Sequence, residues 1–419
     1  MNVSEKSAFS KRVLPLFLAG HVLIYFQKTD VGGAKRDSAV GHLPLIKYIA
    51  EHGNLPLPGD YHVANIPVWH FFAAFLYNIS NSTFFIALFQ ITIAVVTLFI
   101  LESILSQYVP QSVSNLLVTS IALNSYFISS SHFATTDGLA IFSFSLFLFA
   151  LNKLYFYPDS FIYIVIINIS LALSALNRQM FIMLFVIYAI TFFRRKPISR
   201  IIVEVLPSGL IVVMGFFLFY VNYCNFLNSD VCWPVRQSRD LVFPVLVNLP
   251  VVMLLVVIFL FPILVMRETR NIKNLILGSI ILVALAIFFE LYGNKKIFSE
   301  RNLTGGGLYK FREIFGSVSV LIDIISMTFF CIITLVVYRK NGYGSWAYQS
   351  ILVFVLSSVF GPYAFQRYFE IYILILCALF LSINSGKIFS SSIISLKVWS
   401  IFLIVFQVSE YLASAFIPI

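Results

Sequence analysis

Residues Lys28–His70 read KTDVGGAKRDSAVGHLPLIKYIAEHGNLPLPGDYHVANIPVWH and form a polar stretch between two hydrophobic segments. Up to His62, its ionisable side chains include four acids, three histidines and four bases: Asp30, Asp37, Glu51, Asp60, His42, His52, His62, Lys28, Lys35, Arg36 and Lys47. Because only 11% of the chain is charged, we expect a cluster of this density to be solvated and to line a site. The rest of the sequence is interpreted around it.

The composition predicts a polytopic membrane protein. Apolar residues make up 60% of the chain and aromatic residues 17%, whereas soluble domains are about half apolar and about a quarter charged. A soluble chain of this composition would expose a large apolar surface. The net charge of +10 is not concentrated in a basic domain outside the apolar segments. Membrane lipids and phosphates are therefore the expected partners, and nucleic acid is not.

The apolar segments predict an all-α fold. About 20 apolar residues are needed for one helical crossing, and lipid tolerates only helices or closed barrels. Runs of this length exclude barrel strands. We therefore expect one transmembrane domain over 1–419 with about thirteen helices. They lie near 13–27, 83–105, 113–131, 139–156, 160–176, 179–193, 201–223, 243–266, 274–292, 316–338, 346–362, 368–385 and 394–416. The segment 66–79 is too short to span and is expected to be interfacial or re-entrant.

The basic residues predict which connections share a side. Those in short loops directly beside the apolar segments favour an N-terminus on the inner side, with the first span retained and not cleaved as a signal peptide. With that orientation, the polar clusters all emerge on the outer face: 27–82, 130–138, 177–179, 224–242, 293–315 and 363–370. Convergence of this kind is what an outward-facing active site requires.

Two ionisable residues lie at the ends of predicted spans. Asp137 follows two threonines, where an aspartate commonly caps a helix. Arg178, followed by Gln179, lies between two apolar runs. It either reaches the headgroup region or serves the outer site, because ionisable residues at this depth are functional candidates.

The later polar clusters carry candidate phosphate ligands. The segment 293–315 contains three consecutive glycines after Arg301, so its backbone N–H groups can approach a phosphate. The alternative is a flexible gating loop. Near the end of the chain, Arg367 and Tyr368 stand at the mouth of a span, where they either bind the phosphate or anchor the helix at the interface.

The sequence contains only weak signals for a metal site or a disulfide. His52 and His62 lie ten residues apart and no HxxxH or HExxH motif occurs, so no metal site is expected. A divalent cation held by outer-loop carboxylates remains an alternative. Cys224 and Cys232 share one loop and are able to form a disulfide in an oxidising compartment. The cysteines inside apolar runs, Cys331 and Cys377, are expected to be core residues.

These features fit transfer of a sugar from a lipid phosphate, and their motifs resemble the GT-C membrane glycosyltransferases. The closest resemblance is to the dolichyl-phosphate-glucose-dependent alpha-1,2-glucosyltransferases, which complete the lipid-linked oligosaccharide. The acidic first-loop motif of that family resembles Asp37, His42 and Pro44, followed by Asp60, Asn65 and Pro67. Its Tyr-Thr-Asp and Arg-Gln-Thr-Asn motifs resemble Thr135-Thr136-Asp137 and Arg178-Gln179. Its late motifs resemble Arg301, loosely, and Arg367-Tyr368-Phe369.

The chain also departs from the family pattern. An Asp-Glu pair is replaced by Asp37-Ser38, and the spacing to His42 is one residue longer. The predicted catalytic base is therefore Asp37, with Asp60 as the second candidate. The resemblance implies substrate-binding roles for the other residues in the motifs: His42, Asn65, Asp137, Arg178, Gln179, Arg301, Arg367 and Tyr368.

The resemblance implies an inverting transfer of a hexose from a polyprenyl-phosphate donor to a lipid-linked or other glycan acceptor. The membrane would be the plasma membrane of a bacterium or the endoplasmic reticulum of a eukaryote, with the site on the extracytoplasmic or lumenal side. No cofactor is predicted apart from the alternative of a divalent cation. Two alternatives stay open, an O-antigen-type polymerase or ligase and a lipid-linked glycan flippase or solute transporter. The second is disfavoured because no internal repeat is found.

Overall fold

The computed structural model describes residues 13–22, 34–61, 63, 66–224, 248–260, 304–305, 317–341, 346–358, 364–365, 369–385 and 396–416. The regular elements within them are helices apart from two strands of two residues each, so the expected all-α class is confirmed. The chain forms two compact units. The first comprises Met1–Ile104, Ala122–Val242 and Glu410–Ile419, and the second comprises Leu105–Ile121 and Phe243–Ser409.

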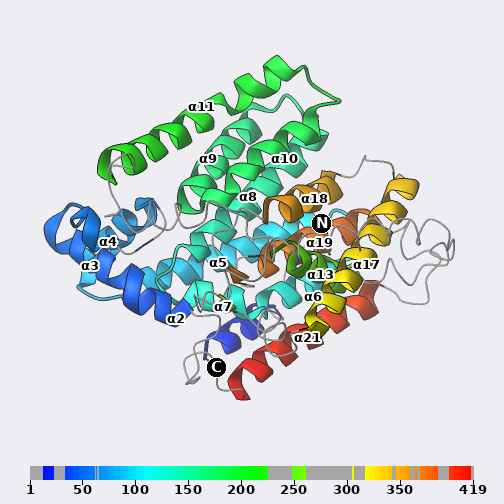
Figure 1. The fold of residues 1–419 in the computed structure, drawn as a ribbon, viewed down its shortest axis with the longest axis horizontal. Helices are drawn as coiled ribbons and strands as arrows, with labels where there is room; N and C mark the ends of the chain where they lie inside the picture. Colours follow the sequence, from blue (N-terminus) through cyan, green and yellow to red (C-terminus); the bar gives the residue numbers. More distant parts are fainter. Residues whose placement is uncertain are drawn as a thin grey trace. The chain divides into compact units, whose positions relative to one another are not determined.

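The first unit holds the polar first loop and a group of long helices (Figure 1). In chain order its helical elements are Val13–Val22, α2 (Ala34–Asp37), a π-helical turn (Ser38–His42), α3 (Leu43–His52), a 3-10 turn (Pro58–Asp60), α4 (Val68–Ser80), α5 (Phe84–Leu105), α7 (Ser125–His132), α8 (Asp137–Phe156), α9 (Phe161–Asn177), a second 3-10 turn (Gln179–Ile182), α10 (Met183–Phe192), α11 (Ile198–Phe216) and a second π-helical turn (Phe217–Tyr223). Helix α9 packs against both α8 and α11, and α3 packs against α4.

The second unit contains α6 (Gln111–Ala122), α13 (Asn248–Phe259), α17 (Ser317–Asn341), α18 (Trp346–Ser357), α19 (Glu370–Ile383) and α21 (Leu396–Phe416). Helix α19 is almost entirely buried and packs against α13 and α18. The strands β1 (Thr304–Gly305) and β2 (Ala364–Phe365) pair in parallel. This pairing joins segments of two predicted polar clusters, 293–315 and 363–370.

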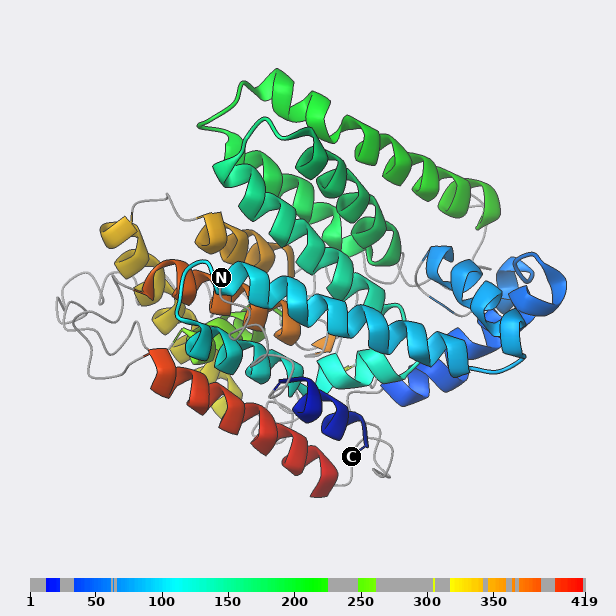
Figure 2. The ribbon, with the colours of Figure 1, turned by 180° about the vertical axis from the view of Figure 1, so that it is seen from behind.

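Three helices in the described part of the chain are long and apolar enough to cross a membrane: Phe84–Leu105, Asp137–Phe156 and Ile198–Val221. The first, which is seen along its length in Figure 2, has 22 residues. At 1.5 Å per residue it extends about 33 Å, comparable with a hydrocarbon core of about 30 Å. The other apolar helices are shorter, at 10–17 residues.

Most predicted spans correspond to a described helix, but one prediction was wrong. The expected span 113–131 is two helices, α6 and α7, separated at residues 123–124. Asn124 caps α7 by accepting hydrogen bonds from the backbone N–H groups of Tyr126 and Phe127, both at 3.0 Å. Asparagine is a preferred N-cap residue. The short helix 66–79 is found as α4, whereas the span 274–292 lies outside the described residues.

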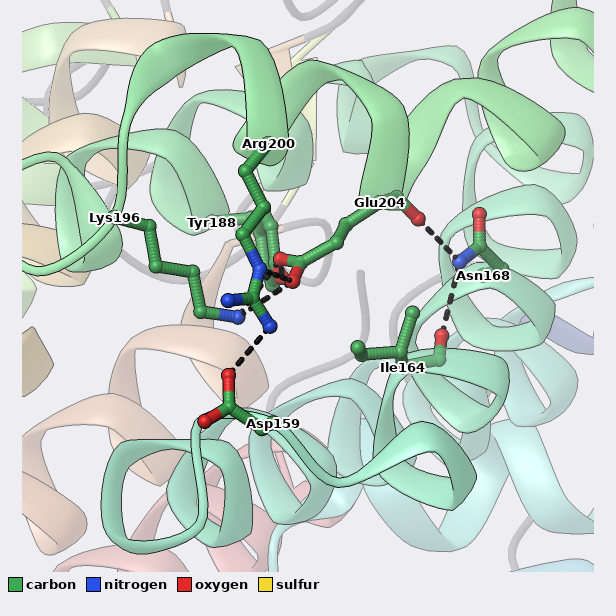
Figure 3. Close-up of polar contacts among 7 residues, drawn as sticks. All are labelled: Asp159, Ile164, Asn168, Tyr188, Lys196, Arg200 and Glu204. Carbon is green, nitrogen blue, oxygen red and sulfur yellow. Dashed lines mark hydrogen bonds and ion pairs between the residues drawn. The ribbon is translucent and has the colours of Figure 1, made fainter.

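Helix α11 contains an internal proline, Pro207, whose missing N–H weakens the helix at that point. The side chain of Asn168 on α9 bonds to the helix backbone beside the proline. Its amide donates to the carbonyl of Glu204 at 2.7 Å (Figure 3). Its oxygen accepts from the N–H of Ser208 at 3.0 Å. These are the two groups that an α-helix would pair with each other. Asn168 therefore joins α9 to α11 at the proline.

The side chain of Glu204 is the centre of a buried ionic cluster (Figure 3). Both carboxylate oxygens accept from Nζ of Lys196 at 2.8 Å, and the hydroxyl of Tyr188 donates to one of them at 2.5 Å. Arg200 also bonds to Glu204 at 3.0 Å and pairs with Asp159 in the turn between α8 and α9. The cluster ties this end of α11 to α10 and to that turn.

Candidate functional site

An ion pair joins Asp137 and Arg178 in the first unit. Asp137 is the first residue of α8 and Arg178 directly follows α9, so the hairpin of these two helices brings them together. Their side chains are only 14% and 12% exposed. The capping interpretation of Asp137 was wrong, because Thr136 occupies the N-cap and no side-chain cap is formed. The headgroup interpretation of Arg178 was also wrong, since its charge is paired inside the protein.

The residue after the ion pair contacts the end of α11. Gln179 donates from Nε2 to the hydroxyl of Tyr220 at 2.6 Å. Tyr220 stacks on Phe216 and meets Phe219 edge to face, with ring centroids 5.5 Å and 5.1 Å apart. Three of the predicted site residues, Asp137, Arg178 and Gln179, are thus held in one continuous group of contacts.

The same aromatic group reaches the first loop. The ring of Tyr61 packs edge to face on Phe219 and Tyr223, and the hydroxyl of Tyr223 donates to the carbonyl of Pro56. Burial raises the pKa of Tyr61 well above its usual value, with smaller contributions from Tyr220 and Tyr223. Tyr61 is therefore a neutral phenol, and it fixes residues 56–61 against the end of α11.

Asp37 and His42 stand one π-helical turn apart. The backbone N–H of Leu43 bonds to the carbonyl of Ser38, five residues earlier, and this bond closes the wide turn. A π turn is the usual way in which a helix accommodates an extra residue, and such turns are frequent at functional sites. Asp37 and His42, five residues apart, are thus separated by about one turn and lie on the same side of the helix. Helix α2, which ends at Asp37, packs against α7.

His42 is hydrogen-bonded to a second histidine. Its Nδ1 lies 2.8 Å from Nε2 of His70 on α4, and the two ring planes are nearly parallel, 9° apart, with centroids 5.1 Å apart. His70 is fully buried. Sequence reasoning did not identify His70, although a histidine inside an apolar 13-residue helix is a signal that was available.

A second histidine pair lies beside α7. The Nδ1 atoms of His21 and His132 are 3.5 Å apart, and Nε2 of His21 is 3.1 Å from the hydroxyl of Ser131. His21 is buried and hydrogen-bonded, as is typical of a core histidine. Among the described residues, no group of three or more His, Cys, Asp or Glu side chains is arranged to hold a metal ion.

Gln90 of α5 holds the start of α8 in place. The amide of Gln90 donates to the carbonyl of Thr135 at 2.8 Å. A Cβ atom on Gly138 would overlap Oε1 of Gln90 and lie 2.9 Å from the carbonyl oxygen of Ser130. Glycine at position 138 therefore allows the close contact that positions Asp137.

The remaining predicted residues are not part of this group. Asp60, the second choice for the base, ends the 3-10 turn with its side chain exposed. Four of the others, namely Asn65, Arg301, Arg367 and Tyr368, lie outside the described residues. Cys224 is disulfide-bonded, and Cys232 is again outside the described part. Cys331 and Cys377 are free thiols, and Cys377 is buried as expected.

Comparisons with known proteins give no relative: no family model, no curated protein and no solved structure matches the chain.

Proposed function

We propose that the chain is a multi-pass membrane glycosyltransferase of the GT-C type. It transfers a hexose from a polyprenyl phosphate to a glycan or lipid-linked glycan. The observation that supports this most is the contact between separate polar segments of the first unit. The first loop reaches α7 through α2 and the end of α11 through Tyr61, and Asp137 meets Arg178. All these segments share one face in the orientation deduced from the basic residues.

The proposed reaction is a single displacement at the anomeric carbon. The carboxylate of Asp37 accepts the proton of the acceptor hydroxyl while the hydroxyl oxygen forms its bond to the anomeric carbon. The bond from that carbon to the phosphate oxygen breaks, and the polyprenyl phosphate leaves with the electron pair. The configuration is inverted. We favour Asp37 over Asp60 because Asp37 is half-buried beside the buried His42, whereas Asp60 is exposed.

The other roles follow the motifs. Arg301, Arg367 and Tyr368 bind the phosphate and stabilise its developing charge. His42, Asn65 and Gln179 contact sugar hydroxyls. The ion pair of Asp137 with Arg178 leaves little net charge, so we propose that it shapes the site and does not compensate the phosphate.

The proposed membrane arrangement has about thirteen helices and places the site on the extracytoplasmic or lumenal side. Three candidate spans and the exposed apolar side chains of α11 support membrane insertion. The membrane would be the bacterial plasma membrane or the endoplasmic reticulum.

The decisive experiment is single-turnover transfer from a polyprenyl-phosphate hexose to a pool of lipid-linked glycans, with purified protein. Asp37→Asn is expected to reduce transfer by at least about 10²-fold. Glu51→Gln, an exposed carboxylate of the same loop, serves as the matched control and keeps the wild-type rate. A parallel reaction with EDTA tests the divalent-cation alternative.

The same experiment separates the alternatives. Product formed only from a polyprenyl-pyrophosphate glycan would indicate a polymerase or ligase. Movement of a lipid-linked glycan across a vesicle bilayer without a new glycosidic bond would indicate a flippase. Equal transfer by the wild type and Asp37→Asn would contradict the assignment of the base.

A further inference from the structure

We propose that His70 is a positioning residue that holds His42 as the neutral tautomer with its proton on Nε2. The two imidazoles meet through Nδ1 of His42 and Nε2 of His70, 2.8 Å apart. Their planes differ by only 9° and their centroids are 5.1 Å apart, so the two rings are nearly coplanar and meet edge to edge through this bond. A bond of this kind needs a proton on one of the two nitrogens and a lone pair on the other.

The surroundings of His70 decide where that proton lies. Burial, and secondarily the charge of His42, lower the pKa of His70 well below its usual value, so its ring carries one proton. Its other nitrogen, Nδ1, is buried and finds no hydrogen-bond partner within the described part of the chain. A buried N–H without a partner is rarer than an unsatisfied acceptor. The proton of His70 is therefore on Nε2, from which it donates to Nδ1 of His42.

This direction of the bond fixes His42. Its Nδ1 is occupied as an acceptor, so the proton of the neutral ring is on Nε2. His42 then offers an N–H donor and no second lone pair. It is suited to bind an oxygen atom, such as a sugar hydroxyl, a phosphate or a carboxylate, and it is unsuited to accept a proton.

Together with the proposed function, on which this step rests, the inference separates two roles in the first loop. The proton from the acceptor goes to a carboxylate, with Asp37 five residues earlier on the same side of the helix. His42 orients an oxygen beside that carboxylate. His70 acts only through His42.

The tautomer is measured without any assumption about activity. The chain has six histidines, and ¹⁵N ring spectra of labelled protein distinguish the two ring nitrogens of each. The signals of His42 and His70 are assigned by their loss in His42→Gln and in His70→Gln. In the wild type we expect His42 to carry its proton on Nε2, and His70 likewise. A proton on Nδ1 of His42, or on both of its nitrogens at pH 7.5, would overturn the proposal.

Substitutions at His70 test the positioning role. His70→Gln places an amide N–H where Nε2 stands and is expected to keep the His42 tautomer. His70→Asn reaches only the position of Nδ1, and His70→Phe keeps a planar ring without a nitrogen. Both are expected to give a mixture of His42 tautomers and to lower the transfer rate about tenfold, the value of one hydrogen bond. Unchanged His42 spectra in His70→Phe would also contradict the proposal.

The two proposals fail differently. If no donor supports transfer by the wild type, the proposed function is wrong while the spectra still decide the tautomer. If transfer occurs but His70→Gln is as slow as His70→Phe, the positioning role is wrong and the transferase assignment stands.

Discussion

Arg178, the residue that follows α9, is paired with Asp137, the residue that begins α8. Both side chains are largely buried, so each charge depends on the other. Removing one partner of a buried pair leaves an uncompensated charge, which costs about 3–5 kcal/mol. Replacing both with apolar residues of similar size is often far less damaging.

We therefore predict that Asp137→Leu and Arg178→Met each lower the thermal unfolding midpoint strongly, and that the double variant is more stable than either. Unfolding of the detergent-purified protein, followed by tryptophan fluorescence, measures this. Arg194→Gln, at an exposed position, is the control and is expected to have no effect. Additive losses in the double variant would show that the two charges are not coupled.

The bridge of Asn168 across Pro207 gives a second prediction. Asn168→Leu leaves the carbonyl of Glu204 and the N–H of Ser208 without this partner, at a cost of about 1–3 kcal/mol for each group. In a Pro207→Ala background the helix can pair those two groups itself. We expect the penalty of Asn168→Leu to be much smaller there, and an equal penalty in both backgrounds would contradict the bridging role.

The close contact at Gly138 predicts that Gly138→Ala is destabilising by about 1–3 kcal/mol, because the new Cβ overlaps Gln90. Gln90→Ala should recover only part of the loss, since the Ser130 carbonyl lies on the backbone. Gly209→Ala is the matched control within a helix, where the nearest atom to a new Cβ is 4.0 Å away. Chemical denaturation of the three variants measures the differences. A harmless Gly138→Ala would mean that α5 and α8 are not in close contact here.

The π turn between Asp37 and His42 gives a prediction about chain length. Val40 is exposed inside this turn. A π turn holds one residue more than an α-helical turn, so deletion of Val40 allows an ordinary α-helix in which Asp37 and His42 keep nearly the same relative angle. The unfolding midpoint should be unchanged or higher, and transfer should be retained. Insertion of an alanine after Val40 instead rotates Asp37 by about 100° relative to His42, so transfer should be lost. Equal transfer by the deletion and insertion variants would contradict the importance of this relative placement.

The buried histidine predicts how stability depends on pH. Since the pKa of His70 is lowered in the folded protein, the unfolded chain binds one more proton once the pH falls below about 6.5. Stability should then fall by about 1.4 kcal/mol per pH unit for this group, down to its folded pKa. His70→Gln should remove that slope between pH 6.5 and 5. An identical pH dependence in wild type and variant would contradict it.

The elements that could be predicted from the sequence are those whose signal is local. Apolar runs of helical length predicted α5, α8 and α9 to within a few residues. The ends of those runs indicated Asp137 and Arg178, but their pairing became visible only in the helical hairpin. The prediction of a single span over 113–131 was wrong because the apolar residues around Asn124 outweighed its helix-capping signal.

Other features have no local signal. His42 and His70 are 28 residues apart and are joined only by the packing of α3 on α4. The π turn has no sequence marker in Ser38–His42. Gln90 stands within a uniformly apolar helix, and its role follows from the position of Thr135. These residues were found from tertiary contacts alone.

Pro207 divides α11 into two parts. The first part is held by the Glu204 cluster, whereas the second part continues into the turn that carries Tyr220 and Tyr223, which bond to Gln179 and to the first loop. Tyr220 stands 13 residues beyond the proline, which corresponds to about 20 Å along the helix. A change of about 20° in the helix direction at the proline would displace Tyr220 by about 7 Å. The two hydrogen bonds of the Asn168 side chain to α11 hold the helix at its present angle.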